Sequence, residues 1–357
     1  HYMTFKKTLY ITGSEWFAIA LGTLAVSVLL NRMADFFHSD ALYNTGIFFL
    51  FLGMVLFLIL FALWTARTFV FPNVILEDWN NLNRISFSTV VPLSMMIMNV
   101  SYISYYPSKI ISLRYLSYYN YIFDFIAILL LSFYLGYKMY TKNIEKGELT
   151  YAELIPPVAL SSTVFLGKRI IPLVGINADL VYFLILMGFG IALFLFLFIG
   201  IMAFTSHIRD IKSSESSPVL VLPVGVSSIL VINIITLSQL PGIFKIPLTV
   251  ALFASVSLWS FELWNFIVAM LVSIKKVFHA KPGISIWAYT FPLAVFSISS
   301  LKLSFVFKSN NYIYPYNITF YTGIIAMVIL IIAWIYAVVI TLIFIKRFNI
   351  QSQKSSS

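Results

Sequence analysis

Cysteine is absent from the 357 residues of the chain, and charged residues are scarce. Without cysteine the protein can form neither disulfides nor thiolate metal sites, and the redox compartment stays undetermined. Asp, Glu, Lys and Arg make up only 10% of the sequence, against roughly a quarter in a soluble domain. Hydrophobic residues make up 61%. This composition predicts a polytopic membrane protein.

The groups that catalysis needs are also scarce. None of the four histidines has a second ligand at metal-binding spacing, and there is no glycine-rich phosphate loop. No nucleophilic triad can be assembled from the intramembrane polar residues, and an intramembrane transferase would need clustered aspartates with a metal. We therefore expect no enzymatic activity, no cofactor and no metal.

Ten apolar runs are long enough to cross a bilayer, whose hydrocarbon core takes about 20 residues of helix. They are approximately Trp16–Arg32, Tyr43–Val70, Ile85–Tyr105, Leu116–Tyr140, Leu154–Leu173, Ala178–His207, Val219–Leu240, Ile246–Val272, Ile286–Phe307 and Ile318–Phe348. We expect one transmembrane domain over residues 1–357, all helical, with polar termini at 1–10 and 351–357 and no soluble module.

The net charge of +10 comes from cations scattered through short loops, which argues against nucleic-acid binding. With ten spans both termini lie on one side of the membrane. That side holds 15 of the 23 lysines and arginines, and the other side holds 8. By the positive-inside rule both termini are predicted to be cytoplasmic in a multi-pass protein of the cell membrane, with lipid as its surroundings.

Proline recurs in alternate spans. The third, fifth, seventh and ninth spans carry Pro92, Pro156 with Pro157, Pro223, and Pro292. The first span has no proline but carries Gly22, whereas the even spans lack interior proline and consist mostly of Leu, Ile, Phe and Val.

A proline inside a helix leaves backbone groups that hydrocarbon cannot satisfy, so a broken helix must face protein or a water-lined cavity. We therefore expect five tandem helical hairpins, with the odd helices inside and the even helices outside. The odd helices would line a central pore, with breaks at Gly22, Pro92, Pro157 and Pro223. The alternative is that small residues and prolines only aid helix packing.

The odd spans resemble the tellurite-resistance/dicarboxylate transporter family, which includes the bacterial TehA channel, yeast-type malate permeases, fungal sulfite exporters and the plant slow anion channel. The matching segments are FAIALGT, NRISFSTVVPLSM, LIPPVALSSTVFLG, LVLPVGVSS and, most specifically, SIWAYTFPLAVFSISSLKL. The resemblance implies ten helices in five hairpins, a pore lined by the odd helices, and usually a homotrimer. It also implies that Phe291, next to Pro292, plugs the pore. The family's His-Pro before the third helix is replaced by Asn81-Leu82-Asn83-Arg84, which puts any role of that histidine in doubt.

Four cations at the ends of odd spans are predicted to attract anions. Arg84 is expected at the cytoplasmic end of span three, and Lys168, Arg169 and Lys302 toward the outer ends of spans five and nine. The alternative is that these side chains snorkel to lipid headgroups.

Two acidic residues fall within even spans, Glu262 in span eight and Asp124 in span four. Because a carboxylate at this depth is costly, each is expected to be paired or protonated. A structural hydrogen bond is favoured over a proton relay because both lie on helices predicted to be outside.

These features predict transport of a small anion, with a malate-like C4 dicarboxylate as the first choice. A passive inorganic anion channel or a sulfite exporter, carrying chloride, nitrate or sulfite, is the alternative, and tellurite resistance would be incidental. A scaffold or sensor without transport would not need breaks confined to alternate helices. The sequence leaves channel and proton-coupled carrier undecided.

Overall fold

The computed structural model describes residues 6, 9–144, 148–209, 214–241, 245–276 and 283–354. Within them, ten helices are long and apolar enough to cross a membrane, as the apolar runs predicted. Each predicted span falls on one of these helices. Most of the predicted polar termini lies outside the described residues, but residues 351–354 continue the last helix.

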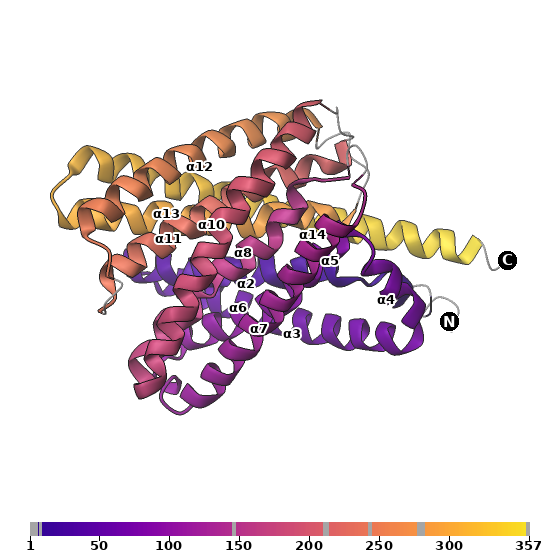
Figure 1. The fold of residues 1–357 in the computed structure, drawn as a ribbon, viewed down its shortest axis with the longest axis horizontal. Helices are drawn as coiled ribbons and strands as arrows, with labels where there is room; N and C mark the ends of the chain where they lie inside the picture. The colour runs from indigo at the N-terminus through magenta and orange to yellow at the C-terminus, as the bar shows by residue number, and fades with distance from the viewer. Residues whose placement is uncertain are drawn as a thin grey trace.

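The even spans are single long helices, consistent with their uninterrupted apolar sequences. They are α3 (Asp40–Val70), α7 (Arg114–Thr141), α10 (Ala178–Arg209), α12 (Leu248–Lys276) and α14 (Ile313–Lys354). The last of these extends beyond the other helices at one end of the bundle, where the C-terminus lies (Figure 1).

Each odd span instead begins with a short helical segment that a longer α-helix follows; η denotes a 3₁₀ turn. The pairs are η1 (Ser14–Trp16) with α2 (Phe17–Phe37), α5 (Leu82–Ser88) with α6 (Val90–Tyr105), η3 (Tyr151–Leu154) with α8 (Ile155–Ser162) and α9 (Val164–Ile170), η6 (Ser214–Val221) with α11 (Leu222–Gln239), and η8 (Ile284–Tyr289) with α13 (Thr290–Ser309). The connections contain α4 (Pro72–Asp78), η2 (Pro107–Lys109), η4 (Ile171–Leu173) and η5 (Gly175–Asn177).

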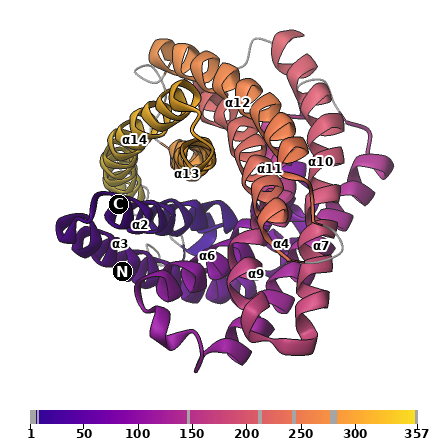
Figure 2. The same cartoon turned by 90° about the vertical axis from the view of Figure 1, so that its left-hand side faces the viewer.

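The odd spans form a closed inner ring. Along it, α2 contacts α6, α6 contacts α8 and α9, α8 contacts α11, α11 contacts α13, and α13 returns to α2. Each odd span also packs against the even span that follows it, which gives five hairpins. Figure 2 looks nearly along α13, which lies between α14, α11 and α2.

Burial separates the two kinds of span as the alternation predicted. In an apolar stretch of 18 residues from each odd span, 61% to 89% of the residues are buried inside the protein. The corresponding share for the even spans is 17% to 33%. The even helices therefore present their apolar side chains to the surroundings, where lipid would cover them.

The prolines lie in the first turns of their α-helices and do not interrupt the helix interiors. Pro157 and Pro292 are each the third residue of their α-helices, α8 and α13, and Pro223 is the second residue of α11. Pro92 is likewise the third residue of α6. The first four N–H groups of an α-helix have no partner within the helix, so proline in this turn sacrifices no helical hydrogen bond.

Gly22 does not mark a break, contrary to our expectation. It lies within the continuous helix α2 and is buried. The pattern of small residues in span one reflects close helix packing, which was the alternative interpretation of that span.

Candidate functional site

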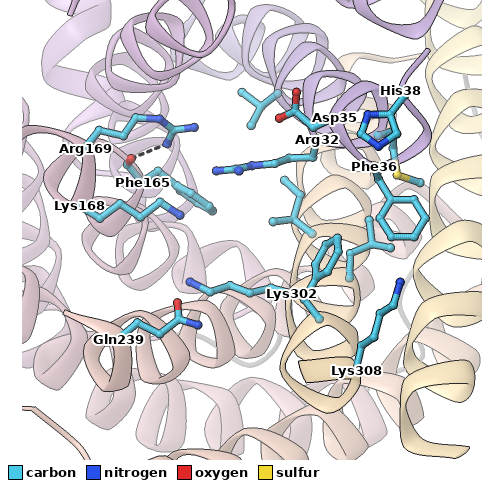
Figure 3. Close-up of a pocket in the computed structure, with 15 residues that line it drawn as sticks. Arg32, Asp35, Phe36, His38, Phe165, Lys168, Arg169, Gln239, Lys302 and Lys308 are labelled. Atoms are coloured by element: carbon cyan, nitrogen blue, oxygen red, sulfur yellow. Dashed lines mark hydrogen bonds between the residues drawn. The ribbon is translucent and has the colours of Figure 1, made fainter. Parts of the chain in front are cut away.

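A cavity of about 540 Å³ lies at the C-terminal ends of the odd spans. Its wall comes from α2, α9, α11 and α13, all of which belong to the inner ring. Five cationic side chains line it: Arg32, Lys168, Arg169, Lys302 and Lys308. Figure 3 shows Arg32, Lys168, Arg169 and Lys302 pointing from three different helices toward a common space. We call this space the cationic cavity.

No carboxylate neutralises these cations at ion-pair distance. Within the described ranges the ion pairs are Arg67 with Asp78, Arg84 with Asp78, and Lys142 with Glu148, none of which touches the cavity. The cavity cations instead repel one another, because Lys168 experiences the charges of Lys302, Arg169 and Arg32. Lys168, Arg169 and Lys302 are half-buried, and Arg32 and Lys308 are exposed. Half-buried cations without an ion-pair partner are costly, so the site favours an anion.

Two of the cations are held in place by uncharged acceptors. Arg169 donates from Nη1 to the backbone oxygen of Phe165 at 2.7 Å and from Nη2 to Oγ of Ser104 at 2.8 Å. Lys302 donates from Nζ to Oγ1 of Thr236 on α11. These bonds fix the positions of the two charges without cancelling them, because none of the acceptors is ionised.

Lys168 has fewer constraints. Its ammonium lies 5.9 Å from the centre of the Phe165 ring, a distance at which a cation is attracted to the aromatic face. No hydrogen bond from its ammonium is found among the described residues. This ammonium is therefore available to a ligand in the cavity.

The hydroxyl groups of the odd spans do not line the cavity. The serines that follow the prolines donate to backbone oxygens of their own helices, as in Ser161 to Pro157 at 2.9 Å and Ser227 to Pro223 at 2.8 Å. The described lining of the cavity contains no serine or threonine. The polar groups that a ligand would meet in this cavity are therefore mainly ammonium and guanidinium groups, together with the amide of Gln239, the ring of His38 and the carboxylate of Asp35.

Phe291 lies deeper in the bundle, on the face of α13 that lines the cavity. Residues 7 or 11 positions apart in an α-helix differ by only about 20° around its axis. Phe291 therefore shares its face with Ile298 and Lys302, which both line the cavity. Phe291 is 6% exposed, and its Cα lies roughly 10 Å farther along the axis than that of Ile298.

The inner helices approach closely at the level of Phe291. A Cβ atom at Gly225 of α11 would lie 3.3 Å from Cβ of Pro292, and a Cβ atom at Gly22 of α2 would overlap the hydroxyl of Thr290. The residues on both sides of Phe291 thus pack against neighbouring ring helices. Phe291 is therefore buried where α2 and α11 approach α13 closely, deeper in the bundle than the cationic cavity.

A comparison with known protein families matches residues 12–342 to the voltage-dependent anion channel (SLAC1) family. The chain belongs to this family. It is the same family that the motifs of the odd spans resemble, and its members are channels and transporters of anions. No curated protein was found to match the chain. The protein is accordingly a multi-pass membrane protein with an anion-transport function.

The two intramembrane acids of this anion-channel homologue are buried and hydrogen-bonded. Glu262 of α12 accepts hydrogen bonds through Oε1 from Ser228 of α11 and from Ser299 of α13, the latter at 2.6 Å. It therefore joins two helices of the inner ring, although it belongs to an outer helix. Its Oε2 is buried and has no hydrogen-bond partner among the described atoms.

Asp124 ends a chain of polar side chains between α6 and α7. Ser117 donates to Oδ1 of Asn99 at 3.2 Å, Asn99 donates to Oδ1 of Asn120 at 3.0 Å, and Asn120 donates to Oδ2 of Asp124 at 2.7 Å. Neither acid lines the cationic cavity. In the described part of the chain no three His, Cys, Asp or Glu side chains lie together as metal ligands would.

Arg84 is separated from the other cations predicted to attract anions. It lies at the opposite end of the inner ring, in α5, and forms an ion pair with Asp78 of the preceding helix. Asp78 also pairs with Arg67 at 2.6 Å, and Nε of Arg67 donates to the backbone oxygen of Tyr10 at 3.0 Å. This network ties α3, α4 and α5 together, so the charge of Arg84 is shared with a carboxylate.

Arg32, Lys308 and Asp35 line the cavity but were not singled out from the sequence. The signal for the two cations was present, because each stands near the C-terminal end of an odd span, as Lys168, Arg169 and Lys302 do. A cation at the end of a span is also what the positive-inside pattern produces, so its position alone does not indicate that it faces a cavity. Asp35 follows Arg32 by three positions, which places both on one helix face, but the sequence did not indicate that this face lines a cavity.

Proposed function

We propose that the protein carries small anions across the cell membrane through the inner ring, from the cationic cavity past Phe291. In this proposal both termini are cytoplasmic and the cationic cavity opens to the outside. The observation that carries it is the group of cations that converge without a carboxylate at ion-pair distance. Such a site concentrates anions. Because the cavity is open, the anions can leave it again, and conduction requires this release.

Phe291 is proposed to obstruct the path. Its burial, its place on the cavity face of α13 and the close approach of α2 and α11 beside it support this role. A bulky apolar ring in a narrow passage excludes both ions and the water that would hydrate them. Pro292 would hold the start of α13 against Gly225 and so fix the position of the Phe291 side chain.

A malate-like C4 dicarboxylate is the proposed substrate. The cavity of about 540 Å³ exceeds what a bare halide needs, and its separate cations suit an anion with two separated charges. The second candidate is a passive channel for chloride, nitrate or sulfite, with tellurite resistance incidental. The name of the matched family, voltage-dependent anion channel, favours it.

The purified protein in proteoliposomes tests these alternatives. Uptake of chloride, nitrate, sulfite and malate is measured under an imposed membrane potential and, separately, under an imposed pH gradient, with protein-free vesicles as the control. Current that follows the potential without pH dependence identifies a channel, and uptake driven by the pH gradient identifies a proton-coupled carrier. Absence of flux for all four anions would overturn the proposed function.

Mass measurement in detergent tests the homotrimer that the family resemblance implies.

A further inference from the structure

Asp35 is the one acidic residue in the described lining of the cationic cavity. It follows Arg32 by three positions on α2, so the two side chains lie on the same face of that helix. Figure 3 shows both at the edge of the space into which Lys168, Arg169 and Lys302 also point. Asp35 acts electrostatically on Arg32, but it belongs to none of the ion pairs found among the described residues.

We propose that Asp35 is a specificity-determining residue, a tethered carboxylate that competes with the transported anion for the cations of the cavity. The proposal rests on the proposed function, since it concerns the site that receives the anion. Asp35 partly offsets the field of Arg32 and repels any anion that approaches. The site consequently binds anions less tightly than its cations alone would, which allows release.

The penalty that Asp35 imposes depends on the charge of the anion. Coulomb energy is proportional to the product of the charges, so a dianion is repelled twice as strongly as a monoanion at the same distance. A fold-change in affinity for a monoanion therefore becomes approximately its square for a dianion. Asp35 thus sets how strongly the cavity prefers dianions over monoanions.

Other charged and titratable groups face the same space and contribute to the electrostatic field on which Asp35 acts. On α2 and its C-terminal cap these are Arg32 and His38, on α9 Lys168 and Arg169, and on α13 Lys302 and Lys308. Arg32 and His38 are each three positions from Asp35, and the charge of Asp35 acts on Arg32, so Arg32 is the expected partner of Asp35. The effect of removing Asp35 should therefore diminish when Arg32 has also been neutralised.

Uptake into proteoliposomes by Asp35→Asn tests the inference. The half-saturating external concentrations of nitrate and of malate are measured, and whichever anion is not transported is measured as a competitor of the other. For charges about 7 Å apart in a water-like medium we expect a decrease of about threefold for nitrate and about sevenfold for malate. Asp40→Asn is the matched control, because Asp40 begins α3 at the same end of the bundle but does not line the cavity.

Equal changes for nitrate and malate, or the same change in Asp40→Asn, would overturn the proposal, because they indicate a general surface charge. Unchanged half-saturating concentrations in Asp35→Asn would do the same while leaving anion transport itself intact. If the unaltered protein carries none of chloride, nitrate, sulfite and malate, it is the proposed function that fails. An effect of Asp35→Asn that weakens in the Arg32→Gln background supports the assignment of Arg32 as its partner.

Discussion

Gly22 on α2 faces Thr290 on α13 so closely that a Cβ atom at Gly22 would overlap the threonine hydroxyl. The same hydroxyl donates to the backbone oxygen of Trp287 at 2.7 Å, and Thr290 immediately precedes Phe291. This contact lies on the seam where the ninth span meets the first and the inner ring closes. The position of Phe291 therefore depends on a residue distant in sequence that has no side chain.

Replacing Gly22 by alanine should lower stability. Because the methyl group displaces Thr290, the expected loss is about 1–3 kcal/mol, the range for overpacked interiors. Thermal unfolding of the purified protein in detergent measures the effect. In the control Gly136→Ala, no heavy atom lies within 4 Å of the new Cβ, so that variant should match or exceed the parent. Equal midpoints for the two variants would contradict the close contact.

Phe291→Ala should raise anion conductance severalfold, because it removes the phenyl group from the proposed path between the inner helices. Recording in planar bilayers or oocytes, normalised to surface expression, measures the change. Phe305→Ala is the control, because Phe305 lies on a similar face of α13 but lines the cationic cavity. An unchanged current in Phe291→Ala at normal expression would count against the obstruction, and an equal increase in Phe305→Ala would show that the effect is not local.

The ten spans were predictable because a membrane-spanning helix needs a long apolar run. The prolines also marked the inner spans, although they stand in the first turns of their helices and cost no helical hydrogen bond. Lys168 and Lys302 were predicted to lie toward the same outer ends of their spans, but the sequence did not indicate that they line one cavity, because that depends on how α9 and α13 pack. The ion pair of Arg84 could not be predicted for the same reason. Its partner Asp78 lies in a short helix of the connecting segment, and no periodicity marks that pairing.

Glu262 should act as a structural link between α11 and α13. Glu262→Gln keeps an oxygen that can accept from Ser228 and Ser299, so stability and any pH dependence of uptake should be preserved. Glu262→Ala removes the acceptor and leaves a void, and we expect it to lower stability by about 2–4 kcal/mol. Thermal unfolding and uptake at several pH values measure the two effects. Loss of pH-dependent uptake in Glu262→Gln would instead favour a role in proton transfer.

Neutralising Lys168 should weaken anion uptake with little effect on folding, because its ammonium has no hydrogen bond to lose among the described residues, whereas Arg169 and Lys302 are anchored. We expect Lys168→Gln to raise the half-saturating anion concentration by about three- to tenfold, the effect of one charge at close range in a partly solvated site. Lys275→Gln, at the exposed end of α12, removes the same charge away from the cavity and should leave uptake unchanged. The comparison separates a cation that receives anions from one that extends to lipid headgroups. If the two variants take up anions alike, Lys168 serves the membrane surface and the cavity does not bind anions through it.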